Sequence, residues 1–199
     1  MALLAAGVVT FLVIDPLLAW DEQNPWLGRG RLFLYFTTQS NALAVAAYAA
    51  FGVALLRGRR PGRALELLRG LATVDMAITG IVHGLVLADP SAPWSFSEFV
   101  LHQAGPILIA LWWIALPPSP RLSFAAVPLW LAHPLIWTAG ALTYRAESSD
   151  GWAPYFFLDP TQVDGWGGVA TFVAVILVAH AVLGAGAVLV SRAPWARRG

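Results

Sequence analysis

Long apolar segments recur along the chain, separated by shorter stretches that carry charge, glycine or proline. An α-helix rises 1.5 Å per residue, so about 20 apolar residues are enough to cross the hydrocarbon core of a bilayer. The chain therefore predicts a single all-α membrane domain over residues 1–199 with six transmembrane helices. We expect these helices at residues 3–20, 32–56, 65–88, 98–116, 124–144 and 167–190.

The charges between the apolar segments predict the orientation. Arginines follow the second, fourth and sixth segments, at residues 57–63, at Arg121 and in the tail after residue 191, whereas Asp89 and Asp150 follow the third and fifth. Arginine is enriched in loops that stay in the cytoplasm. We therefore expect a multi-pass protein of the cell membrane with both termini in the cytoplasm.

Composition narrows the classes of function further. The chain is 58% hydrophobic and 12% charged with a net charge of +1, so no basic face argues for a nucleic acid partner. It has no cysteine, which excludes disulfides, thiolate nucleophiles and cysteine-ligated metals. All cations are arginine, and with the abundant alanine, glycine and proline this indicates a GC-rich, bacterial genome. Because the first segment lacks a basic start and contains Asp15-Pro16, we interpret it as a transmembrane helix and not as a signal peptide.

A run of polar side chains interrupts the second apolar segment at residues 35–41, with the sequence Tyr-Phe-Thr-Thr-Gln-Ser-Asn. A polar group left unpaired in hydrocarbon costs several kcal/mol, so these side chains need partners. They could hydrogen-bond to neighbouring helices, at about 1 kcal/mol each. They could equally line a polar pocket that binds or reacts with a ligand.

All four histidines fall inside predicted helices, where ionisable residues often mark functional sites. His83, His102, Asp15 and Thr37 each lie four or five residues from the outer end of a different helix. At 1.5 Å per residue all are roughly 6 to 8 Å below the outer interface. The sequence therefore predicts one polar level shared by four helices.

The other two histidines, His133 and His180, fall nearer the middle of the membrane, as does Asp75. Each histidine also has a simpler explanation. His83 follows Asp75 and Thr79 at steps of four, so these three share a helix face and can satisfy one another. His180 stands alone among apolar residues, as a packing residue does, and His133 precedes a proline that leaves a carbonyl without its donor.

His102 differs from the other histidines because a proline follows it four residues later. Pro106 has no N–H group and leaves the carbonyl of His102 itself without a helical donor. A local distortion at a buried histidine is typical of functional sites. His102 is therefore the strongest histidine candidate.

Three short motifs carry a resemblance to a known family: one in the expected helix at 32–56, one in the expected helix at 98–116, and one in the loop before the expected helix at 167–190. The chain resembles the androgen-induced and androgen-dependent integral membrane threonine hydrolases and their bacterial six-span relatives, over most of its length. The motifs are Tyr35-Phe36-Thr37 with Asn41, Leu101-His102 with Pro106, and Gly151-Trp152-Ala153-Pro154-Tyr155-Phe156-Phe157-Leu158-Asp159.

Animal members of this family hydrolyse fatty acid esters of hydroxy fatty acids with an intramembrane threonine and histidine. By resemblance, Thr37 is the nucleophile and His102 its partner in an intramembrane hydrolase of lipid esters that needs no cofactor or metal. A neutral imidazole can take the proton of a threonine hydroxyl and later protonate the leaving alkoxide. Thr38 is the alternative nucleophile, since it lies about 100° away on the same helix.

Other polar residues of the outer level can support this chemistry. Asn41 and Gln39 lie within one turn of Thr37 and are the nearest side-chain amides for a developing oxyanion. Asp15 can orient the histidine, and His83 is a further supporting residue at the same level. The expected substrate is a lipid in the bilayer.

Two other classes of function remain open. The polar level could be the binding site of a membrane transporter or a non-catalytic lipid-binding protein. The histidines could also ligate two b-type haems, with His83 paired to His102 and His133 paired to His180, since histidine is a usual axial ligand of haem.

Overall fold

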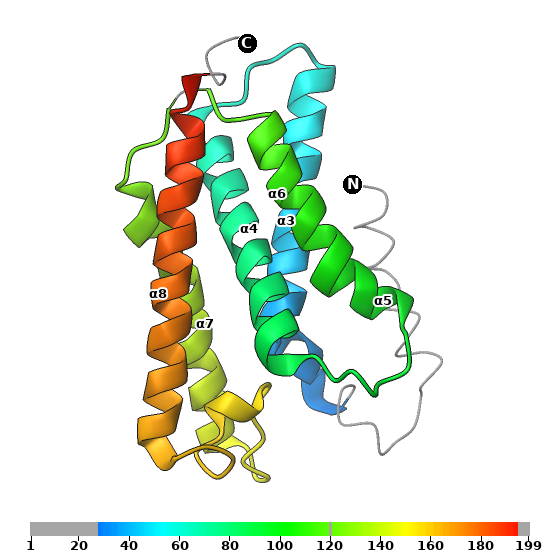
Figure 1. Cartoon of the computed structure of the whole chain (residues 1–199), viewed down its shortest axis with the longest axis vertical. Coiled ribbons are helices and arrows are strands. Elements are labelled where there is room, and N and C mark those ends of the chain that lie inside the picture. Colours follow the sequence, from blue (N-terminus) through cyan, green and yellow to red (C-terminus); the bar gives the residue numbers. More distant parts are fainter. Residues whose placement is uncertain (1–27, 120, 195–199) are drawn as a thin grey trace.

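A computed structural model describes residues 28–119 and 121–194 of the chain (Figure 1). The predicted first helix at residues 3–20, with Asp15, lies outside this range. All regular secondary structure in the described residues is helical, as the apolar segments predict.

Each predicted helix in the described range is a helix, although its limits and its type differ in places. The long α-helices are α3 (Phe36–Leu56), α4 (Arg63–Val82), α6 (Gly105–Ala115), α7 (Ala126–Glu147) and α8 (Gly165–Ser191). Shorter elements are the 3₁₀ helices η2 (Gly28–Leu34) and η5 (Phe156–Leu158), the one-turn helix α5 (Phe96–Phe99), and the π-helical turns η3 (His83–Leu87) and η4 (Val100–Ala104).

Within the described residues, four helical segments are long and apolar enough to cross a membrane, which suggests a membrane protein. They are Phe36–Leu56, Arg63–Leu87, Phe96–Ala115 and Gly165–Ser191. The outward face of α8 agrees with this, because Val175, Val178 and Val182 are each about two-thirds exposed and offer apolar contact to lipid. The predicted helix at 124–144 is present as α7 but does not reach this apolarity. The number of spans therefore stays a prediction.

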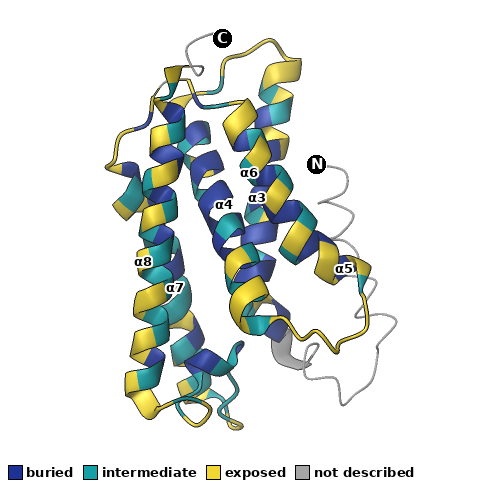
Figure 2. Ribbon diagram, viewed as in Figure 1, coloured by how far each residue is buried: buried dark blue, intermediate teal, exposed yellow. Residues whose placement is uncertain are grey.

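Helix α4 is the centre of the bundle and packs on α3, α6, α7 and α8 (Figure 2). Small residues allow the close approach of α3 and α4, since Ala44, Ala47 and Ala72 are fully buried at their contact. Gly70 serves the contact with α7, because a Cβ there would overlap the ring of Trp130. These side-chain sizes fix the neighbours of α4 and thereby the positions of its polar residues.

The loops fall into two groups at opposite ends of the bundle (Figure 1). The loops 57–62 and 116–125 and the C-terminal end of α8 lie at one end, and the loops 88–95 and 148–164 lie at the other. This grouping is the one that the charge pattern predicts. Which end faces the cytoplasm stays a prediction.

Candidate functional site

The polar run at residues 37–41 turns mostly into the bundle. Thr37, Thr38, Ser40 and Asn41 are all buried. The hydroxyl groups of Ser40 and Thr79 lie 2.8 Å apart and join α3 to α4. Part of the run therefore connects helices.

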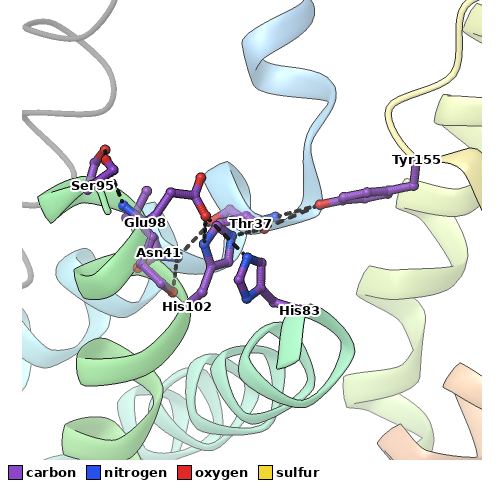
Figure 3. A network of polar contacts seen from close by, with 9 residues as sticks. Thr37, Asn41, His83, Ser95, Glu98, His102 and Tyr155 are labelled. Carbon is purple, nitrogen blue, oxygen red and sulfur yellow. Dashed lines mark hydrogen bonds and ion pairs between the residues drawn. The ribbon is translucent and has the colours of Figure 1, made fainter. Parts of the chain in front are cut away.

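Thr37 lies where three segments of the chain meet (Figure 3). Its Oγ1 atom is 3.2 Å from Nε2 of His102, which η4 carries. It is also 3.3 Å from the hydroxyl oxygen of Tyr155, in the loop before η5. The same oxygen accepts the backbone N–H of Thr37 at 3.3 Å. The hydroxyl of Thr37 thus touches one imidazole and one phenol.

A carboxylate lies on the far side of the His102 ring. Nδ1 of His102 is 2.9 Å from Oε2 of Glu98, four residues earlier in the chain. The side chain of Ser95 accepts the N–H of Glu98 and caps α5 at this point. Thr37, His102 and Glu98 therefore form a continuous row of hydroxyl, imidazole and carboxylate.

Glu98 and Tyr155 are not among the site residues predicted from the sequence. The predicted orienting carboxylate, Asp15, lies outside the described residues. The sequence does hold a signal for Glu98, because a carboxylate four residues before a histidine shares its helix face. Tyr155 belongs to the third family motif, which carries the resemblance but implies no chemical role for this residue.

His83 stacks on His102, with ring centroids 3.9 Å apart and an angle of 8° between the rings. Its Nε2 atom lies 3.2 Å from Oε2 of Glu98, the oxygen that His102 also approaches. His83 is thus brought to the predicted polar level. Its partners are Glu98 on α5 and His102 on η4. They are not Asp75 and Thr79 of α4, the partners that the spacing suggests.

The two stacked histidines both lie on π-helical turns. His83 begins η3, and His102 lies in the middle of η4, where the missing N–H group of Pro106 leaves a helical carbonyl free. Gly80 lets α4 approach η4 and the start of α6, because a Cβ there would lie 2.9 Å from Cβ of Pro106 and 3.3 Å from the carbonyl oxygen of His102. π-Turns are frequent at functional sites.

Thr38 and Asn41 flank the site without facing its cavity. The hydroxyl of Thr38 is buried and has no hydrogen-bond partner within the described part of the chain. The amide nitrogen of Asn41 donates to the carbonyl oxygens of Thr37 at 2.9 Å and Leu101 at 3.4 Å. Asn41 therefore ties α3 to η4, and its role toward an oxyanion stays a prediction.

Gln39 points toward α7. Its amide nitrogen donates to the carbonyl of Phe33 at 2.8 Å, and its Oε1 atom lies 3.3 Å from Nε2 of His133. Both polar atoms of this amide thus have partners outside the site. The role of Gln39 toward an oxyanion stays a prediction.

The remaining histidines gather around a second buried carboxylate. Oδ2 of Asp75 is 2.8 Å from Nδ1 of His133, and Oδ1 is 3.6 Å from Nε2 of His180. Asp75 is fully buried. His180, expected to be a packing residue, therefore has a polar neighbour as well.

Neither histidine pair fits the axial ligation of a haem. Axial histidines direct one nitrogen each toward the iron from opposite faces of the porphyrin. His83 and His102 instead lie face to face at 3.9 Å, and His133 and His180 both turn a nitrogen toward Asp75.

Two cavities meet at Thr37. One, here called the polar cavity, has a volume of about 280 Å³ and a mixed lining that includes the polar side chains of His83, Glu98 and His102. The other has a volume of about 50 Å³ and is lined almost entirely by apolar side chains of α4, α7, α8 and η5. Thr37 and Tyr155 line both cavities. The hydroxyl of Thr37 therefore lies between a polar space and a narrow apolar one.

The loop that carries Tyr155 is held in place by a charged contact and by ring packing. Arg145 of α7 donates to Asp159 at 2.8 Å. Tyr155 stacks on Phe157, with centroids 5.1 Å apart. Burial raises the pKa of the Tyr155 phenol, so this hydroxyl stays protonated at neutral pH and can donate a hydrogen bond.

Comparison with known proteins adds no further assignment. No protein-family model matches the chain, and neither the curated proteins nor the solved structures contain a match.

Proposed function

We propose that this protein hydrolyses esters of lipids within the membrane, with Thr37 as the nucleophile and His102 as the general base. The observation that carries the proposal is the distance of 3.2 Å between Thr37 Oγ1 and His102 Nε2 at the meeting point of the two cavities. Nucleophile and base within hydrogen-bond reach, with a third group behind the base, are the signature of an activated hydroxyl. The resemblance to membrane threonine hydrolases supports the same residues.

In the first half of the reaction, His102 acts as the base. When the ring proton is on Nδ1, 2.9 Å from Oε2 of Glu98, the ring presents a lone pair on Nε2 and takes the proton of Thr37 as the threonine oxygen attacks the ester carbonyl. Glu98 orients the ring and stabilises the imidazolium. The protonated hydroxyl of Tyr155, 3.3 Å from Thr37 Oγ1, can donate to the oxyanion of the tetrahedral intermediate.

The intermediate then collapses and the bond to the leaving oxygen breaks. The imidazolium gives its proton to the departing alkoxide, and Thr37 is left as an acyl ester. In the second half a water molecule loses a proton to His102 and attacks this ester. The second tetrahedral intermediate collapses, the imidazolium returns its proton to the threonine oxygen, and the carboxylic acid leaves.

The two cavities suggest how a substrate lies. The apolar cavity is narrow and lined by side chains such as Ile78, Val173 and Ile176, which offers apolar contact to the part of an acyl chain next to the ester. The polar cavity then receives the alcohol portion. In fatty acid esters of hydroxy fatty acids, which the family resemblance implies, both halves have a long chain, and the alcohol half is the more polar one because it also carries a free carboxyl group.

The proposal is tested with protein purified in detergent. We expect release of free fatty acid from a branched lipid ester and of p-nitrophenol from p-nitrophenyl esters, and labelling of a peptide that contains Thr37 by a fluorophosphonate probe. Lipid binding without turnover or labelling would instead support a non-catalytic binding protein. A Soret absorbance in the purified protein would support a haem protein despite the arrangement of the histidines.

A further inference from the structure

The proposed hydrolysis gives no role to the imidazole of His83. His102 serves Thr37, and Glu98 serves His102, but His83 also places Nε2 at 3.2 Å from the same carboxylate oxygen. Two imidazoles and one carboxylate thus meet at one side of the polar cavity (Figure 3).

We propose that His83, Glu98 and His102 bind a divalent transition metal, represented by Zn²⁺, and that the bound metal stops hydrolysis. The binding site follows from the geometry of these side chains alone. Its inhibitory effect rests on the proposed function.

The donor atoms are already spaced as ligands of one ion. The three lie within 4.8 Å of one another, and the two nitrogens are 2.9 Å and 3.2 Å from the glutamate oxygen. Zinc–ligand bonds of about 2.0–2.2 Å in a tetrahedron separate neighbouring ligand atoms by about 3.3–3.5 Å. Because a metal lies near the plane of each imidazole that binds it, the two stacked rings would have to tilt toward each other, bringing their nitrogens from a separation of at most 4.8 Å to this spacing.

The chemistry of the donors favours zinc. Two imidazoles and one carboxylate form a known ligand set for Zn²⁺, with the fourth position open to water. The carboxylate is accessible, because half of the Glu98 side chain is exposed and the cavity beside it has a volume of about 280 Å³. By contrast, Asp75 and His180 of the second cluster are almost completely buried and offer no room for a hydrated ion.

Metal binding would remove the lone pair that Thr37 needs. A metal on Nδ1 of His102 requires the lone pair of that nitrogen, so the single proton of the neutral ring moves to Nε2. Nε2 then donates to Thr37 and can no longer take its proton. Glu98, occupied by the metal, also ceases to support an imidazolium. His102 and Glu98 can therefore either bind the metal or activate Thr37, but not both at once.

The test compares wild type, His83→Ala and His133→Gln, all purified in detergent, treated with chelator and freed of any histidine tag. Zn²⁺ binding is measured by competition with a chromogenic chelator. We expect one ion per wild-type chain, binding weakened at least about tenfold in His83→Ala, and wild-type binding in His133→Gln. The control removes a different imidazole that also contacts a carboxylate.

Hydrolysis is measured in parallel, relative to the metal-free rate of each variant. We expect Zn²⁺ to suppress hydrolysis in wild type and in His133→Gln, EDTA to restore it, and the same concentration to have little effect on His83→Ala. Equal binding by wild type and His83→Ala would overturn the site, as would no binding at all. Activation by Zn²⁺ would overturn the inhibitory role. His83-dependent binding without any hydrolysis would uphold the site and reject the proposed function.

Discussion

Thr37 and His102 lie 65 positions apart in the chain, yet Oγ1 of the first and Nε2 of the second are 3.2 Å apart. The contact joins α3 to the π-turn η4. It is supported from two sides, by Asn41, whose amide bridges the carbonyls of Thr37 and Leu101, and by Gly80, which lets α4 approach Pro106.

The two neighbouring threonines should behave differently. We expect Thr37→Ala to abolish ester hydrolysis and fluorophosphonate labelling, because the hydroxyl on the imidazole is lost. Thr38→Ala should keep most of both, since the hydroxyl it removes has no partner in the described part of the chain. Initial rates and labelling by mass spectrometry measure this. The reverse pattern would assign the nucleophile to Thr38.

Replacing Glu98 by glutamine tests the row of three groups. Glu98→Gln retains the size of the side chain but not its charge, so the imidazolium loses its counter-charge. We expect kcat to fall by about 10²- to 10⁴-fold with little change in KM. Because the groups act as a unit, His102→Ala/Glu98→Gln should be little worse than His102→Ala. A rise in KM alone would assign Glu98 to substrate binding.

Tyr155→Phe should lower kcat by about 10²-fold, as expected when one donor to an oxyanion is removed. Tyr144→Phe is the matched control, because the hydroxyl it removes accepts from Arg31 and lies away from Thr37. Burial raises the pKa of Tyr155, so its donor form persists above the ordinary value of about 10. A fall in wild-type activity between pH 8 and about 9.5 that is absent in Tyr155→Phe would contradict the raised pKa, and an unchanged kcat in Tyr155→Phe would contradict the donor role.

Gly80→Ala tests the close approach of α4 to η4 and α6. The added Cβ would lie 2.9 Å from the rigid ring of Pro106, so the helices must separate at a cost of about 1–3 kcal/mol. We expect a lower thermal midpoint and reduced hydrolysis, because His102 moves with its π-turn. Gly140→Ala in α7 adds the same methyl group where no atom lies within 4 Å. Equal effects of the two changes would argue against the close approach.

Narrowing the apolar cavity should select shorter acyl chains. Ile176 lines this cavity, whereas its neighbour Val175 is 63% exposed on the outer face of α8. We expect Ile176→Trp to lower kcat/KM for long-chain p-nitrophenyl esters much more than for the acetate, and Val175→Trp to leave the ratio unchanged. An unaltered chain-length profile in Ile176→Trp would place the acyl chain elsewhere.

Local sequence determined the helices and much of the polar level. Apolar runs of about 20 residues can satisfy their backbone groups in lipid only as helices or closed barrels, and the positions of α3, α4 and α8 follow from such runs. Counting residues from the helix ends also placed Thr37, His83 and His102 at one depth, because the rise per residue is nearly constant.

Only the tertiary structure decided which of these side chains touch. Periodicity gives the face that a residue occupies on its own helix, but the neighbour of that face depends on small residues such as Gly80 and on π-turns that rotate the residues beyond them. His83 therefore meets His102 and not Asp75, Thr37 faces the imidazole and Thr38 does not, and a loop about 118 residues further along the chain delivers Tyr155 to Thr37. These contacts join distant segments, and no pattern within one helix contains them.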